Sequence, residues 1–163
     1  MTEVLSIHAS GALSTVDFDD GTSLRCTRDF AARSHFSRGQ EIDPVFVDRL
    51  RESASFDLAT HEARRLIRRQ RYSRNEIAAK LNVAGLASDV IRETLGLLER
   101  RGELDDLAVA LHIARQKLRL AQSRNAALTW SEFGPAQARR LTMRGFHAGA
   151  AKQAVRLAWS ELA

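Results

Sequence analysis

The residues of this sequence with the clearest chemical potential are arginines. Arg64, Arg68 and Arg71 are spaced i, i+4 and i+7, and Arg65 and Arg69 extend the same surface of an expected helix. A guanidinium group carries five N–H donors in a planar fork that matches the oxygens of a phosphate or a carboxylate. The pattern predicts a contact site for an anionic partner. A basic helix face that simply binds water is the alternative.

The full predicted contact set contains nine arginines from two parts of the chain. It comprises Arg64, Arg65, Arg68, Arg69, Arg71, Arg74, Arg139, Arg140 and Arg144. We expect these side chains to bind a partner protein or DNA, and we assign none of them a catalytic, cofactor-binding or metal-binding role.

Charge is distributed unevenly along the 163 residues. Residues 1–57 hold six basic and ten acidic side chains, whereas the whole chain has a net charge of +5, so the remainder carries +9. A basic half behind an acidic front is typical of proteins that meet a polyanion or an acidic protein surface.

Signatures of enzymes and of metal sites are missing from the sequence. There is no glycine-rich phosphate loop, no nucleophile elbow and no metal-ligand spacing among the five histidines. The single cysteine, Cys26, rules out an internal disulfide, and we interpret it as a small strand residue. We therefore predict a protein that is not an enzyme and needs no cofactor.

Membrane and export signals are also missing. No apolar run approaches the roughly 20 residues that span a bilayer, and the N-terminus lacks the basic flank and apolar stretch of a signal peptide. We expect a cytoplasmic, monomeric protein with no membrane partner.

The first fifty residues favour a small antiparallel sheet. Two β-favouring runs, residues 4–9 and 13–18, are split by Ser10-Gly11, and Asp20-Gly21 is a strong hairpin signal before a third run. Asp43-Pro44 then reads as the cap and first residue of a short helix.

Helical signals dominate from Ser55 onward. Ser73 and Glu76 form a capping box at a helix start, and Gly85 is placed to end that helix. Ser88 is expected to cap the next helix, and Pro135 to be the first residue of a later one.

Gly102 is expected to end the helix after Ser88, and two acidic residues follow it. Asp105 is expected to cap a long helix that begins near Asp106, where a carboxylate meets the positive end of the helix dipole. We also expect this pair to hold neighbouring units in register.

An internal repeat appears when the helical part is shifted by sixty positions. The shift lays Lys80, Leu81, Gly85, Leu86 and Leu95 over Arg140, Leu141, Gly145, Phe146 and Val155. The predicted fold is mainly α, with tandem three-helix repeats preceded by a small N-terminal antiparallel β module. The expected units are residues 1–54, 55–102 and 103–163. Because each repeat is small, the interface between them should help to bury apolar surface.

The order of these signals resembles the RecX family of recombination regulators over roughly residues 58–162. The resemblance is carried by the run Arg71-Tyr72-Ser73-Arg74-Asn75-Glu76-Ile77 with Lys80-Leu81, by Gly102-Glu103-Leu104-Asp105-Asp106, and by Gly134-Pro135 with Leu141 and Arg144-Gly145-Phe146. The Gly39-Gln40-Glu41 turn of the sheet module is similar to the N-terminal extension of many members.

The resemblance implies a regulator in homologous recombination, DNA repair and the SOS response. Such a protein binds the RecA recombinase, lies along the groove of its nucleoprotein filament, and restrains ATP hydrolysis and strand exchange. Weak, salt-sensitive contact with single-stranded or duplex DNA is compatible with this role.

Two features depart from the family pattern. Members usually carry a third three-helix repeat, whereas this chain stops at Ala163 after the second. The segment after Asp106 reads Leu107-Ala108-Val109-Ala110-Leu111, where members tend to place an aromatic and basic residues.

Two other functions stay open. In an autonomous DNA-binding protein, the helices after Ser73 and Ser88 would act as a helix-turn-helix, although Glu93 and Glu99 are unusual in a recognition helix. An adaptor built of stacked helical units would bind its partner without the arginines.

Overall fold

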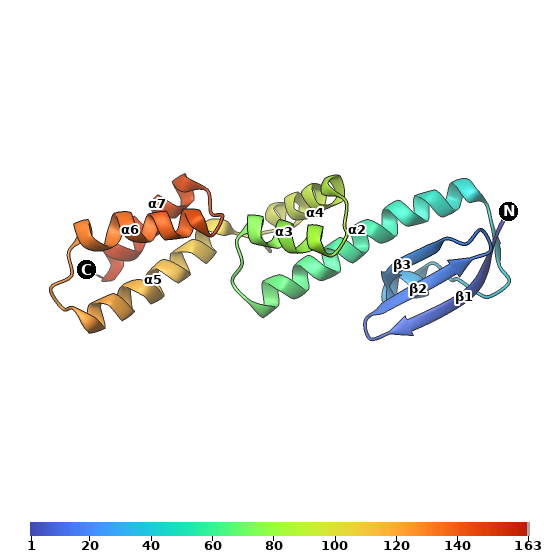
Figure 1. The fold of residues 1–163 in the computed structure, drawn as a ribbon, viewed down its shortest axis with the longest axis horizontal. Coiled ribbons are helices and arrows are strands. Elements are labelled where there is room, and N and C mark those ends of the chain that lie inside the picture. The colour runs from blue at the N-terminus through green and yellow to red at the C-terminus, as the bar shows by residue number, and fades with distance from the viewer. Residues whose placement is uncertain (163) are drawn as a thin grey trace.

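The protein is described by a computed structural model that covers residues 1–162. It forms a row of three structural parts, with a small sheet at one end and two groups of three helices beyond it (Figure 1). The fold is mainly helical with an N-terminal antiparallel sheet, as the sequence predicted.

The sheet contains four antiparallel strands in the order β3-β2-β1-β4. The strands are β1 (Thr2–Ser10), β2 (Leu13–Phe18), β3 (Ser23–Thr27) and β4 (Glu41–Ile42). Gly21 adopts a positive φ of 78° in the predicted turn, and Asp20 accepts a hydrogen bond from the Thr22 amide there. Alternate residues of β2 and β3 are buried, so one face of the sheet is apolar.

Helix α1 (Arg28–Arg33) was missed by the sequence analysis. It begins directly after β3, with Thr27 as its cap, and buries Phe30 against the sheet. Strand β4 was missed as well, because two residues are too short to carry an alternating pattern.

The sheet is covered by helix α2 (Pro44–Arg69), which is one helix of 26 residues. Asp43 caps it and Pro44 is its first residue, as predicted. The prediction of a short helix here, followed by a second helix from Ser55, was wrong. No glycine or proline interrupts residues 45–69, so nothing stops the helix once it has begun.

Helix α2 contributes to two apolar cores along its length. Val47 and Ala54 pack with the sheet, whereas Ala63 and Leu66 pack with the next two helices, α3 (Arg74–Val83) and α4 (Ser88–Arg100). The first three-helix unit is therefore the C-terminal half of α2 with α3 and α4.

The second three-helix unit contains α5 (Asp106–Arg124), α6 (Trp130–Met143) and α7 (Ala148–Leu162). Positions related by the sixty-residue shift have the same burial in the structure. Leu81 and Leu95 are buried, and so are their counterparts Leu141 and Val155. The apolar residues fall into three separate clusters, within residues 4–54, 63–104 and 107–162.

Two predicted helix starts were wrong. Ala87 occupies the cap position of α4 and no side chain caps that helix, so Ser88 is its first residue. Helix α6 begins at Trp130, five residues before Pro135, because the carboxylate of Glu132 accepts a hydrogen bond from the Thr129 amide and caps an extra turn. Pro135 is tolerated inside this helix at the loss of one backbone hydrogen bond.

The contact between the two three-helix units is polar, whereas the sequence analysis expected an apolar interface. We call it the junction; it is the turn between α6 and α7 placed on the first turn of α3. Ser73 Oγ donates to the Arg144 carbonyl at 3.0 Å, and Asn75 Nδ2 donates to the Gly145 carbonyl at 2.7 Å. Arg144 also lies 3.3 Å from the carboxylate of Glu76.

Asp106 completes the junction from the other direction. Its Oδ1 accepts a hydrogen bond of 2.7 Å from the Arg74 amide, so the first residue of α5 caps the first residue of α3. Asp105 accepts from the Ala108 amide and caps α5 itself, as predicted. Of the two acidic residues that the sequence analysis expected to hold the units in register, Asp106 makes the contact between them and Asp105 acts within α5.

Replacing Gly145 with alanine tests how tightly the junction packs. Gly145 has a φ of 90°, and an added Cβ would lie 3.0 Å from the Asn75 Cβ. The left-handed backbone costs an alanine about 1–2 kcal/mol, and crowding adds about 1–3 kcal/mol. Gly85 is the matched control, because its φ is 86° but nothing lies within 4 Å of its Cβ position. We expect urea unfolding to show a clearly larger stability loss for Gly145→Ala, and equal losses would contradict the described packing.

A second prediction concerns the Asp106 carboxylate. Asp106→Ala leaves the Arg74 amide without its partner and should lower the free energy of unfolding by about 1–3 kcal/mol, whereas Asp106→Asn keeps the acceptor oxygen and should cost much less.

The stability of the original protein and that of the Asp106→Asn variant should also depend differently on pH. Burial raises the pKa of Asp106, against the opposing effect of the Arg74 amide. The ionised carboxylate is thus disfavoured in the folded state, and this cost disappears as the pH falls through the raised pKa. We expect the stability of Asp106→Asn relative to the original protein to decline between pH 7 and pH 4. A relative stability that rises over this interval would contradict the assignment.

Candidate partner-binding surface

The nine predicted arginines divide into two groups in the structure. Four of them contact carboxylates of the same chain, in the pairs Arg64–Glu103, Arg65–Glu62, Arg74–Glu99 and Arg144–Glu76, at 2.7, 2.7, 2.8 and 3.3 Å. Within residues 1–162 the other five, Arg68, Arg69, Arg71, Arg139 and Arg140, have no such partner. The second group is the part of the set with charge available for a partner.

Arg64 illustrates why the paired arginines differ from the rest. Its Nε and Nη2 donate to the two carboxylate oxygens of Glu103, each at 2.7 Å, and join α2 to the loop before α5. This bidentate pair lowers the pKa of Glu103. Both side chains are about one-third exposed, so the pair orients the side chains more than it stabilises the fold.

Four of the five unpaired arginines line grooves on the surface of the molecule. Helix α2 ends at Arg69, so Arg71 lies beyond it, in a groove of about 220 Å³ between the two three-helix units. Arg68 lines a polar cleft of about 300 Å³ that also contains Asp57 and His61. Arg139 and Arg140 lie near other grooves of the second unit.

A group of basic side chains that the sequence analysis missed comes from both three-helix units. The pKa of His112 in α5 is lowered, first by partial burial and then by the positive charges of Arg71 from the first unit and of Arg115 and Arg119 from α5. Arg115 also holds α5 to α7, because its Nε and Nη2 donate to Glu161 at 2.7 Å. We call Arg71 and Arg119, the two of these arginines that have no carboxylate partner among residues 1–162, the basic face.

This group of basic side chains could have been found from the sequence. Arg115 and Arg119 are spaced i, i+4 and lie opposite the apolar stripe of α5, but the sequence analysis interpreted that helix only as core. Residues 107–162 hold nine basic side chains against two acidic ones, whereas residues 58–106 hold ten against eight. The excess positive charge is therefore concentrated in the second three-helix unit.

Other kinds of site find little support in the part of the chain that the structure describes. In residues 1–162 no three His, Cys, Asp or Glu side chains are grouped so that they could hold a metal ion. None of the described helices is both long and apolar enough to cross a bilayer. Cys26 is buried in the sheet core, and burial raises the pKa of its thiol.

Comparison with known proteins identifies the fold. No protein-family model matches the sequence. No curated protein matches it either. Among solved structures, one described as the crystal structure of regulatory protein RecX superposes with a TM-score of 0.60 over 96% of this chain and 74% of that chain, at 14% sequence identity. The chain therefore has the fold of regulatory protein RecX.

Proposed function

We propose that this protein regulates a recombinase by binding its nucleoprotein filament, as the RecX resemblance implies. The observation that carries the proposal is the superposition over 96% of the chain, which includes both the sheet and the two three-helix units. The partner would be the RecA filament, and the expected effect is slower ATP hydrolysis and strand exchange.

The shape of the molecule supports this function. The three parts lie in a row (Figure 1), and directional hydrogen bonds at the junction fix the angle between the two helical units. An elongated body of fixed geometry is suited to a filament, which presents the same surface at regular intervals. Flexibly linked units would lose more conformational entropy on binding.

The charge distribution supports it as well. The basic face combines Arg71 of the first helical unit with Arg119 of the second, which is the more strongly positive of the two. A filament on single-stranded DNA is an acidic polymer, so this face would increase the rate of encounter and contribute salt-sensitive affinity.

An autonomous helix-turn-helix protein is less well supported. Arg74 would have to reach DNA from α3, yet it is paired with Glu99. Helix α4, in the position of a recognition helix, exposes Glu93 and offers only Arg92 before its C-terminal end. Carboxylates at these positions would repel the phosphate backbone.

The ATPase rate of RecA on saturating single-stranded DNA tests the proposal. We expect inhibition when this protein is added at concentrations well below that of the recombinase, and we expect inhibition to survive a large excess of DNA. Inhibition that vanishes with extra DNA would show competition for the strand instead. No inhibition at any ratio would reject the regulatory function.

Charge reversal locates the surface that acts. The double variant Arg71→Glu with Arg119→Glu removes two exposed members of the basic face, and we expect at least about tenfold weaker inhibition, since each lost phosphate or carboxylate contact is worth about 1 kcal/mol. Arg25→Glu with Arg49→Glu reverses two exposed charges in residues 1–54 and should leave inhibition unchanged. Equal effects of the two double variants would remove the basic face from the proposal.

The pKa of His112 reports polyanion contact directly. Because nearby positive charges help to lower this pKa, a bound polyanion should raise it. We expect an upward shift when the single-stranded oligonucleotide (dT)20 is added, measured from the imidazole proton resonance during a pH titration, and a smaller shift at high salt. Saturating (dT)20 with an unchanged His112 pKa would place DNA elsewhere on the molecule.

A further inference from the structure

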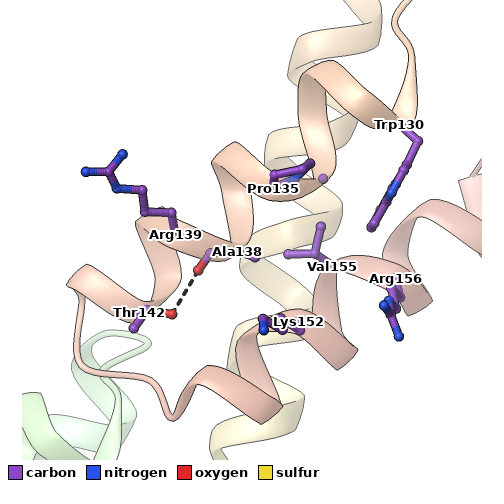
Figure 2. A pocket seen from close by; sticks show the side chains of 9 residues that line it. Trp130, Pro135, Ala138, Arg139, Thr142, Lys152, Val155 and Arg156 are labelled. Atoms are coloured by element: carbon purple, nitrogen blue, oxygen red, sulfur yellow. Dashed lines mark hydrogen bonds between the residues drawn. The ribbon is translucent and has the colours of Figure 1, made fainter.

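A groove between α6 and α7 has no role in the function proposed above. Its volume is about 380 Å³, and its apolar lining comes from Trp130, Pro135, Ala138 and Val155 (Figure 2). All four side chains belong to the second three-helix unit, so the groove is formed within one rigid part of the protein.

Trp130 forms one end of this α6–α7 groove. Glycine at position 134 allows the ring to lie here, because a Cβ there would lie 2.6 Å from two carbons of the Trp130 ring. The indole also makes an edge-to-face contact with Trp159, with ring centroids 5.7 Å apart. The ring is held by these contacts yet remains 37% exposed, so part of its apolar surface is available to another molecule.

Three cationic side chains surround the apolar lining. Arg139 extends from α6, and Lys152 and Arg156 extend from α7 (Figure 2). None of the three has a carboxylate partner among residues 1–162. We call them the basic rim.

The first repeat contains the corresponding groove with different chemistry. Sixty positions earlier, a groove of about 370 Å³ lies between α3 and α4. There Arg74 stands at the position of Gly134, and Glu99 stands at the position of Trp159. Arg74 and Glu99 form an ion pair of 2.8 Å, so the first groove holds a neutralised pair where the second has an apolar floor.

We propose that the α6–α7 groove docks an acidic peptide segment that inserts an aromatic or aliphatic side chain beside Trp130. The carboxylates flanking this anchor residue pair with the basic rim. The proposal rests on the groove alone and does not depend on binding to a recombinase filament.

The geometry favours a peptide over a nucleic acid. Bases of a single strand stack on exposed aromatic faces, one after another along a groove that tracks the phosphates. Here one indole lies at the end of a concave apolar groove between two helices, which is the form that receives a side chain of an extended or helical peptide. A carboxylate of the peptide next to its anchor residue meets a cation of the basic rim on either side.

Selection from a phage-displayed library of random 15-residue peptides tests the proposal on the full chain. We expect enrichment of sequences in which Asp or Glu flanks Phe, Trp, Leu or Met. A synthetic peptide of the enriched sequence should change the tryptophan fluorescence, because both tryptophans of the chain lie at this site.

Matched variants in the two repeats locate the binding. Lys152→Glu with Arg156→Glu should weaken the peptide at least tenfold, and Ala138→Leu should do so by filling the groove. The counterparts in the first repeat, Arg92→Glu and Ala78→Leu, should leave affinity unchanged, and circular dichroism should confirm that all variants are folded.

Three results would overturn the proposal. One is a selection that enriches no acidic and apolar sequences. Another is binding that the first-repeat variants weaken as much as those of the basic rim. The third is quenching of tryptophan fluorescence by (dT)20 that the peptide cannot reverse, which would make the groove a nucleic-acid site.

Discussion

The arrangement of the two helical units depends on satisfying the backbone amides at the start of α3. The first N–H groups of a helix have no partner inside it, and here they lie at the contact between units. Ser73 is fully buried; its hydroxyl accepts from the Glu76 amide and donates to the Arg144 carbonyl. The Arg74 amide is satisfied by Asp106. One helix terminus thus receives partners from residues 32 and 71 positions further along the chain.

A polar junction has a different consequence from an apolar one. Hydrogen bonds specify direction, so the junction fixes an angle although it buries little apolar surface. Each unit meanwhile keeps its own apolar core, which removes the need for a large shared interface. The small size of each unit therefore did not require an apolar interface. In the second three-helix unit, eleven buried residues suffice to pack the three helices around one another.

Local signals in the sequence predicted much of the fold, and long-range contacts account for what it missed. The Ser73–Glu76 capping box and the Gly85 stop are short-range features, and both occur as expected. The continuity of α2 was missed because the absence of a helix-breaking residue is a weak signal. Arg64 pairs with Glu103, which lies 39 positions further along the chain. Rules based on local spacing cannot identify such a partner, so the sequence analysis treated Arg64 as available for another molecule.

The two repeats share a backbone arrangement but differ in the side chains of their grooves. In the first, Arg74 is used twice, since its amide bonds to Asp106 at the junction and its side chain holds Glu99. The amide stays whichever side chain stands at position 74, so only the ion pair with Glu99 depends on the arginine. Gly134 occupies the same place in the second repeat but lies away from the junction, where it is constrained only by the Trp130 ring. The same backbone arrangement therefore carries an ion pair in the first groove and an apolar floor with unpaired cations in the second.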